Sequence, residues 1–245
     1  MNEQNPYAVQ SQPDYGVAAL AERAERVAFI QRTYLHLGLA VICFVVLEGI
    51  LLTLYPPAAF LQQFGPLMGR WGWLVVLGAF MVVSWVARGW AESSTSRGLQ
   101  YAGLMLYVVA EALIFMPLMA YATLVDPSIP MNAGLITAVV FGGLTAFVFL
   151  TGSDFSGLGK YLWIGGLVAL GIIVASIVVP GGLGLGMWFS AALVLLAAGY
   201  ILYDTSNVLH HYRTDQHVAA SLALFASVAL MLWYVMQILI SLQRD

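Results

Sequence analysis

The sequence predicts an all-α membrane protein, a bundle of seven transmembrane helices with a cytoplasmic N-terminus. Hydrophobic residues make up 61% of the 245 residues and charged residues only 9%, whereas a soluble domain carries about 25% charged residues. The mean hydropathy is +0.88. Seven apolar segments have the length of about 20 residues that a spanning helix needs. Together these observations exclude a single aqueous core and predict a multi-pass protein whose first partner is the lipid bilayer.

Short breaks that contain turn-forming residues separate the seven segments. Pro56-Pro57 follows the first segment and Asp126-Pro127 the third, and both pairs are typical of turns. The breaks leave no room for a separate domain between spans. The predicted spans cover residues 27–54, 71–89, 99–122, 132–152, 160–180, 186–209 and 218–241.

The N-terminal residues differ in composition from the rest of the chain. Residues 1–16 are polar and lack the basic and apolar regions of a signal peptide, so we expect a short disordered tail. Residues 17–26 contain good helix formers and lead into the first span. We therefore divide the chain into a polar tail with a lead-in helix, 1–26, and a seven-helix transmembrane domain, 27–245.

The basic residues are distributed unevenly about the predicted spans. With the N-terminus inside, seven of the 9 Lys and Arg residues fall on the inner side. They are Arg23, Arg26, Arg32, Arg88, Arg97, Lys160 and Arg213. Only Arg70 and Arg244 fall on the outer side. Because short cytoplasmic loops carry the excess of Lys and Arg, this bias predicts a cytoplasmic N-terminus.

Small residues recur along one face of the last span. Ala219, Ala223 and Ser227 are spaced by four residues, and small residues let membrane helices approach one another closely. We therefore expect the last helix to lie at the centre of the bundle.

Asp204 is the principal candidate functional residue, because it is an acid inside an apolar segment of helical length. At 1.5 Å per residue it lies roughly 7 Å from the inner end of the sixth span. Arg32 and His36 lie roughly 8 and 14 Å into the first span, and Ser227 lies near 14 Å in the last. If these three spans adjoin, the four residues meet in one layer near the cytoplasm. Asp204 is then a proton switch with Arg32 as its counter-charge, or a structural ion pair that closes the bundle.

Glu111 is the acid closest to the middle of the membrane. It lies about 12 residues into the third span, and we expect no basic residue at its depth. It is either part of an ion or proton path, or a protonated, hydrogen-bonded structural acid.

The sequence lacks the motifs of the common enzyme classes. It holds no GxSxG elbow, HExxH pair or phosphate-binding loop, and we expect neither an enzyme nor a cofactor. Cys43 is the only cysteine, which excludes an intramolecular disulfide and a cysteine-based metal cluster. The net charge of -3 gives no basic patch, so nucleic acid is not an expected partner. Three histidines, His210, His211 and His217, fall in the predicted inner loop between the last two spans. Histidine is the side chain that ordinarily titrates near neutral pH, so the sequence leaves open a pH-sensing loop or a plain solvated loop, and does not predict a metal site.

Three segments of the chain resemble the Bax inhibitor-1 family, also called the transmembrane BAX inhibitor motif family. They are TGSDFSGLGKYL (151–162), GYILYDTSNVL (199–209) and ASLALF (220–225). The resemblance implies a last helix wrapped by the other six and a calcium leak that is sensitive to pH. In several relatives two aspartates gate the leak. Asp204 matches the first of them, and Ser227 stands at the position of the second.

Some bacterial members of that family modulate the membrane-anchored AAA protease of the inner membrane, and the chain is similar to them at this point. They carry a serine in the final span, and their sixth span resembles YDTSNVLHH. This resemblance implies a location in the bacterial inner membrane. It also implies an alternative function as a non-conducting regulator of an AAA quality-control protease, with residues 1–16 as the segment that the protease binds. The sequence leaves both functions open.

Overall fold

The computed structural model describes residues 16–67, 69–93, 96–179 and 181–243. It confirms the predicted number of spans, because seven helices in these residues are long and apolar enough to cross a membrane. They are α1 (Arg23–Leu54), α3 (Arg70–Ala91), α4 (Arg97–Val125), α5 (Ile129–Thr151), α6 (Gly159–Val178), α7 (Met187–His210) and α8 (His217–Leu242). Two short helices, α2 (Pro57–Phe64) and η1 (Ser156–Leu158), lie in connections. The N-terminal tail up to residue 15 lies outside the described residues.

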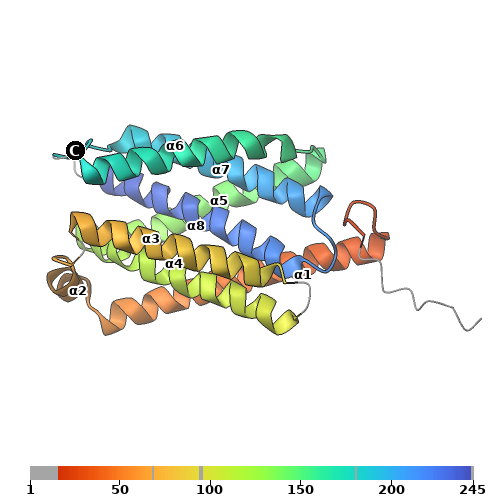
Figure 1. Ribbon diagram of the computed structural model, residues 1–245, viewed down its shortest axis with the longest axis horizontal. Helices are drawn as coiled ribbons and strands as arrows, with labels where there is room; N and C mark the ends of the chain where they lie inside the picture. The colour runs from red at the N-terminus through yellow and green to blue at the C-terminus, as the bar shows by residue number, and fades with distance from the viewer. Residues whose placement is uncertain (1–15, 68, 94–95, 180, 244–245) are drawn as a thin grey trace, which may run out of the picture.

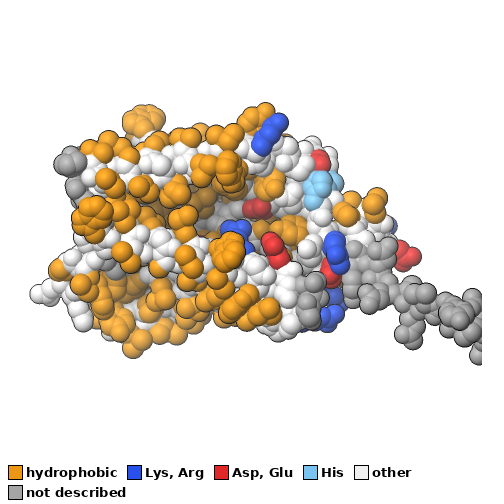
Figure 2. Space-filling view, in the orientation of Figure 1, with side chains coloured by type: hydrophobic (Ala, Val, Ile, Leu, Met, Phe, Trp, Pro, Cys, Tyr) orange, Lys and Arg blue, Asp and Glu red, His pale blue; other side chains and the backbone are white. Residues whose placement is uncertain are grey.

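The seven long helices run side by side along the long axis of the molecule (Figure 1). We call the end where α1, α4, α6 and α8 begin the inner end, and the opposite end the outer end. Figure 2 shows most of the visible charged side chains toward the inner end, and a predominantly hydrophobic surface along the flank. This is the surface that a spanning bundle presents to lipid.

Helix α8 lies at the centre of the bundle, as its small residues predicted. It packs against α1, α3, α4, α5 and α7. Of the residues in its apolar 18-residue stretch, 56% are buried inside the protein. Ala220 and Ala229 are almost fully buried, because short side chains allow the surrounding helices to approach its backbone. The centre of the bundle therefore positions residues of α8 against several neighbouring helices at once.

Helix α2 was not predicted from the sequence, where Pro56-Pro57 indicated only a turn. Pro57 is its first residue, a position that suits proline because the missing N–H has no helical partner there. Phe60 buries its ring against Met116 and Ala120 of α4. The short helix thus covers the outer part of α4.

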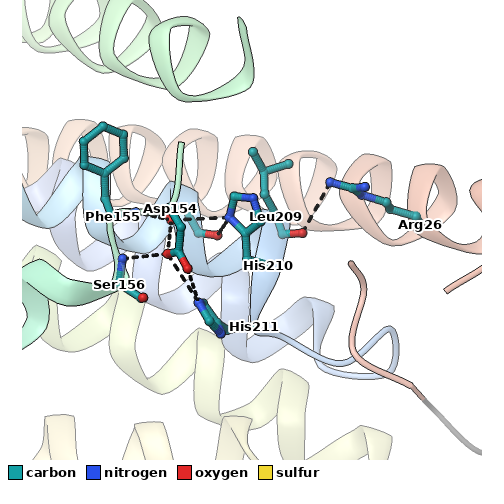
Figure 3. A network of polar contacts seen from close by, with 8 residues as sticks. Arg26, Asp154, Phe155, Ser156, Leu209, His210 and His211 are labelled. Atoms are coloured by element: carbon teal, nitrogen blue, oxygen red, sulfur yellow. Dashed lines mark hydrogen bonds and ion pairs between the residues drawn. The ribbon is translucent and has the colours of Figure 1, made fainter. Parts of the chain in front are cut away.

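The residues before α1 are attached to the loop that joins α7 and α8. Val17 forms an isolated antiparallel bridge with Arg213, and the Ala18 N–H donates to the Tyr212 carbonyl at 2.9 Å. From α1, the Arg26 guanidinium donates to the Leu209 carbonyl at 3.4 Å (Figure 3). These contacts hold the start of the described chain at the inner end.

Candidate functional site

A cavity of about 790 Å³ lies between α3, α4, α6, α7 and α8. Figure 2 shows a hollow on the flank of the bundle, with acidic and basic side chains beside it. The titratable residues that line the cavity are Arg88, Tyr107, Glu111, Tyr200, Tyr203, Asp204 and Tyr234. The wall is otherwise largely apolar, with Trp73, Leu77, Phe80, Phe115, Leu193 and Trp233 among its residues. The cavity therefore places ionisable groups in a mainly hydrophobic enclosure, where unpaired charge is costly.

Asp204 and Ser227 meet across the α7–α8 contact inside this cavity. Both side chains are buried, at 9% and 4% exposure, and the Ser227 hydroxyl donates a hydrogen bond to the Asp204 carboxylate. Asp204 lies six residues before the end of α7 and Ser227 ten residues after the start of α8. The antiparallel packing of these helices brings the two depths together.

Arg88 is the basic residue that lines the cavity. Its guanidinium lies 5.6 Å from the centre of the Tyr107 ring, within reach of a cation–π interaction. It is also close enough to Asp204 and Glu111 for their charges to interact. Glu111 and Tyr107 are one helical turn apart on α4 and interact through their side chains. Arg88 thus links α3 to the acids of α4 and α7.

From the sequence, Arg88 contributed only to the predicted orientation, and its place in the site was not predicted. The depth of Arg88 in its span could have indicated its place in the site. Arg88 lies three residues before the end of α3, or about 5 Å from the inner end. The expectation for Glu111 considered only bases at its own depth. A long arginine side chain extends beyond the level of its own backbone, so Arg88 interacts with Glu111 from a different depth.

Arg32 and His36 lie outside the residues that line the cavity. The face of α1 that packs inward carries Phe29, Thr33 and Leu37, whereas Arg32 is exposed. His36 Nδ1 donates to the Arg32 carbonyl at 2.6 Å. Of the four residues expected in one layer, the cavity therefore brings together Asp204 and Ser227.

The ring of His36 belongs to a small aromatic cluster. It stacks on Tyr101 with centroids 5.4 Å apart and lies 5.1 Å from the ring of His217. These contacts join α1, α4 and α8 near the inner end.

A polar network attaches the loop between α5 and η1 to the inner end of α7. The Ser206 hydroxyl donates to Asp154 at 3.1 Å and accepts from the Phe155 N–H at 2.8 Å. His211 Nε2 donates to the other Asp154 oxygen at 3.2 Å. Figure 3 shows Asp154 turned toward both Ser156 and His211. The Ser156 N–H, at 2.8 Å, and the Ser156 side chain lower the pKa of Asp154 below its ordinary value, and His211 and Ser206 contribute further.

Tyr203 borders both the large cavity and a smaller hollow near the inner end. It lines the large cavity and also a smaller hollow of about 420 Å³ with Asn207, His211 and Tyr212. A Cβ added to Gly159 would lie 2.8 Å from the Tyr203 ring, so the glycine lets this ring pack directly against the start of α6. Tyr203 was not predicted from the sequence as a site residue.

A family model described as "Inhibitor of apoptosis-promoting Bax1" matches residues 26–244. The chain belongs to the Bax inhibitor-1 family. The match extends over all seven spans, so the family assignment rests on the whole membrane bundle. It contains the loop of Asp154 as well as the α7 and α8 residues of the cavity.

Individual relatives come from eukaryotes and bacteria. Bax inhibitor 1 of Schizosaccharomyces pombe is 30% identical over 242 residues, which cover 99% of this chain and 86% of that protein. Protein LIFEGUARD 1 of Arabidopsis thaliana is 32% identical over 103 residues, 41% of this chain and 44% of the relative. An uncharacterized protein of Pseudomonas aeruginosa is 34% identical over 101 residues, 41% and 45% of the two chains. No solved structure matches the chain.

Proposed function

We propose that the protein is a passive cation leak, with calcium as its principal ion, and that protonation of Asp204 controls it. The observation that carries this proposal is the enclosure of Asp204, Glu111 and Arg88 in one intramembrane cavity. Ionisable groups inside a membrane bundle are costly and mark ion or proton pathways. The family resemblance, which implies a calcium leak sensitive to pH, favours calcium as the ion.

The cavity presents two carboxylates, Asp204 and Glu111. A calcium ion takes about 6–8 oxygen ligands at a stable site. Two carboxylates supplemented by water would hold the ion weakly, and weak binding suits passage rather than storage. Glu111 acts in this scheme as the acid on the ion path.

In this proposal the described arrangement is the closed state of the inner end. Ionised Asp204 accepts a charge-assisted hydrogen bond from Ser227 and interacts with the charge of Arg88. These contacts tie α7 to α8 and to α3. Protonation removes the charge of Asp204 and weakens both contacts. The inner end then loosens around Tyr203, the side chain between the cavity and the inner hollow. We therefore expect the leak to increase as the pH falls.

Calcium flux into proteoliposomes tests this function. Wild-type protein is compared with Asp204→Asn at about pH 6 and about pH 8, on either side of neutrality. The variant cannot ionise, so we expect a leak that is open at both values and independent of pH. Glu48→Gln is a matched control, since Glu48 is also a buried acid but does not line the cavity. A pH response of Asp204→Asn identical to that of wild type would remove Asp204 from the mechanism.

Arg32 and His36 enter the proposal only as a second, outlying influence on gating. The His36 ring lies beside that of His217, at the start of α8, the helix that carries Ser227, and the His36 ring is hydrogen-bonded to the Arg32 carbonyl. Replacing His36 with Gln is expected to shift the pH response less than replacing Asp204. A larger effect of the His36 variant would move the proton switch from the cavity to the aromatic cluster.

A second candidate is a non-enzymatic, non-conducting regulator of a membrane-anchored AAA protease in the bacterial inner membrane. One observation favours it: residues 17 and 18 bind the loop after α7, so the described chain begins at the inner end, the side that the charge bias predicts to be cytoplasmic. Relatives in Pseudomonas and Neisseria support the bacterial location. Deletion of residues 1–16 is expected to abolish co-purification with the protease and its regulation. Unchanged binding and proteolysis after the deletion would exclude the tail as the contact.

A further inference from the structure

The large cavity opens on the flank of the bundle. Figure 1 is viewed across the long helices, and Figure 2 shows, in the same view, the hollow between the layer of α6 and α7 and the layer of α3 and α4. Arg88, one of the residues that line the cavity, belongs to the exposed residues of α3. In a membrane this flank faces lipid, so the opening connects the cavity with the hydrocarbon core. A molecule dissolved in the bilayer therefore has direct access to the cavity.

The wall of the cavity has two chemically different parts. Arg88, Asp204, Glu111 and Ser227 form the polar part. The remainder, along α3, α6, α7 and α8, is mostly apolar, with Ser176, Tyr234 and Gln237 as isolated polar side chains. Trp73 there stacks on Trp233 with centroids 6.3 Å apart. The volume of about 790 Å³ lies within the range of about 300–1,000 Å³ typical of ligand sites. This division matches a molecule with one polar head and one hydrocarbon chain.

The head of such a molecule decides whether it binds. A chain that moves from lipid to an apolar protein wall gains little, because lipid tails are as apolar as leucine. The polar part contains two carboxylates, on Asp204 and Glu111, and one guanidinium, on Arg88. When both acids are ionised, the excess charge is negative. A cationic head complements this excess, whereas an anionic head would meet two carboxylates.

We propose that this cavity binds a single-chain lipophilic amine that enters from the bilayer through the opening between α3 and α6. The ammonium group lies at Asp204 and Glu111, where its three N–H donors find carboxylate acceptors. The hydrocarbon chain lies along the apolar wall beside Trp73 and Trp233. Binding itself does not depend on conduction. The consequence for conduction rests on the proposed function: an amine in this position occupies the cation path and blocks the leak.

Quenching of tryptophan fluorescence tests the binding. Purified protein is placed in phosphatidylcholine vesicles, and dodecylamine with a brominated chain is added as the quencher. We expect saturable quenching that unlabelled dodecylamine reverses. Dodecanoate and dodecanol, which have the same chain and an anionic or neutral head, are expected to compete at least about tenfold more weakly, the loss equivalent to one charge-assisted hydrogen bond.

Variants locate the head of the amine. Asp204→Asn and Glu111→Gln are each expected to weaken binding about tenfold. Glu48→Gln, the buried acid outside the cavity, is expected to leave it unchanged. Competition by dodecanoate equal to or stronger than that of dodecylamine would overturn the proposal, since Arg88 would then select the head. An equal effect of Glu48→Gln would also overturn it.

The two proposals fail separately. Saturable, head-selective quenching in a protein without calcium flux would support the amine site and reject the leak. Calcium flux that dodecylamine leaves unchanged, together with quenching that does not saturate, would reject the amine site and retain the leak. The comparison of three amphiphiles uses wild-type protein alone, so the test holds even if the acid variants fail to fold.

Discussion

Replacement of Gly103 by alanine is expected to separate α3 from α4 at the level of Arg88. An added Cβ at Gly103 would lie 2.5 Å from the Ala87 carbonyl oxygen and 2.6 Å from the Ala91 nitrogen. Ordinary contacts between such atoms are about 3.5 Å or longer, and backbone atoms on both sides leave no flexible group to yield. The helices must therefore move apart by about 1 Å, within one turn of Arg88.

The expected change in the free energy of unfolding of Gly103→Ala is the sum of two opposing terms. Overpacking of this kind costs about 1–3 kcal/mol, and alanine regains about 1 kcal/mol in a helix relative to glycine. Gly143→Ala is the matched control, because nothing lies within 4 Å of a Cβ at that position in α5. Gly143→Ala therefore gains the helix propensity of alanine without any overpacking cost. The free energies of unfolding of the two variants should therefore differ by about 1–3 kcal/mol, the overpacking term.

The assay is reversible unfolding by increasing detergent denaturant, followed by circular dichroism, on wild type and both variants. The displacement should also move the Arg88 guanidinium relative to Tyr107 and Asp204, so the pH profile of calcium flux should change in Gly103→Ala and remain unchanged in the control. If Gly103→Ala proves as stable as Gly143→Ala, the close α3–α4 contact and the reasoning built on it are incorrect.

Three further predictions concern the inner end. Ser227→Asp places a second carboxylate beside the first, and two adjacent acids do not ionise independently, so the midpoint of the flux–pH profile should move to more alkaline pH. The pKa of Asp154 is lowered in the folded protein, so its stabilising contacts are present above the unfolded value of about 3.9 and are lost as the pH falls through the lower, folded value. Asp154→Asn should therefore speed hydrogen exchange at neutral pH at the Ser156 amide, which donates to the Asp154 carboxylate, and an unchanged rate would contradict this role. Gly159→Ala should displace the Tyr203 ring and raise the basal calcium leak, and a leak equal to that of wild type would show that this ring does not close the path.

The span count and the central last helix followed from the sequence because both depend on local properties. Length and apolarity define a span, and the spacing of small residues on α8 defines a face with close neighbours. Helix α2 was missed because Pro56-Pro57 breaks the preceding span and also suits the first turn of a new helix. Pro56-Pro57 is therefore compatible both with a turn and with the start of a short helix. The contact of Phe60 with α4 favours the helix.

The site was predicted only in part, since depth does not determine which helices adjoin. Asp204 and Ser227 were placed at compatible depths, and the structure joins them by a hydrogen bond. Arg32 has a similar depth but lies on an exposed face of α1. Arg88 reaches the cavity because Gly103 allows α3 to approach α4 closely. Such a contact between distant segments leaves no periodic signal in the sequence.

Calcium flux through Asp204→Asn tests the central claim most directly. In proteoliposomes at about pH 6 and about pH 8, wild type should leak more at the acidic value, and the variant should leak equally at both. A leak of the wild type that does not respond to pH, or a variant that retains the full response, would contradict the assignment of Asp204 as the switch. No flux above empty liposomes at either pH would contradict the leak itself.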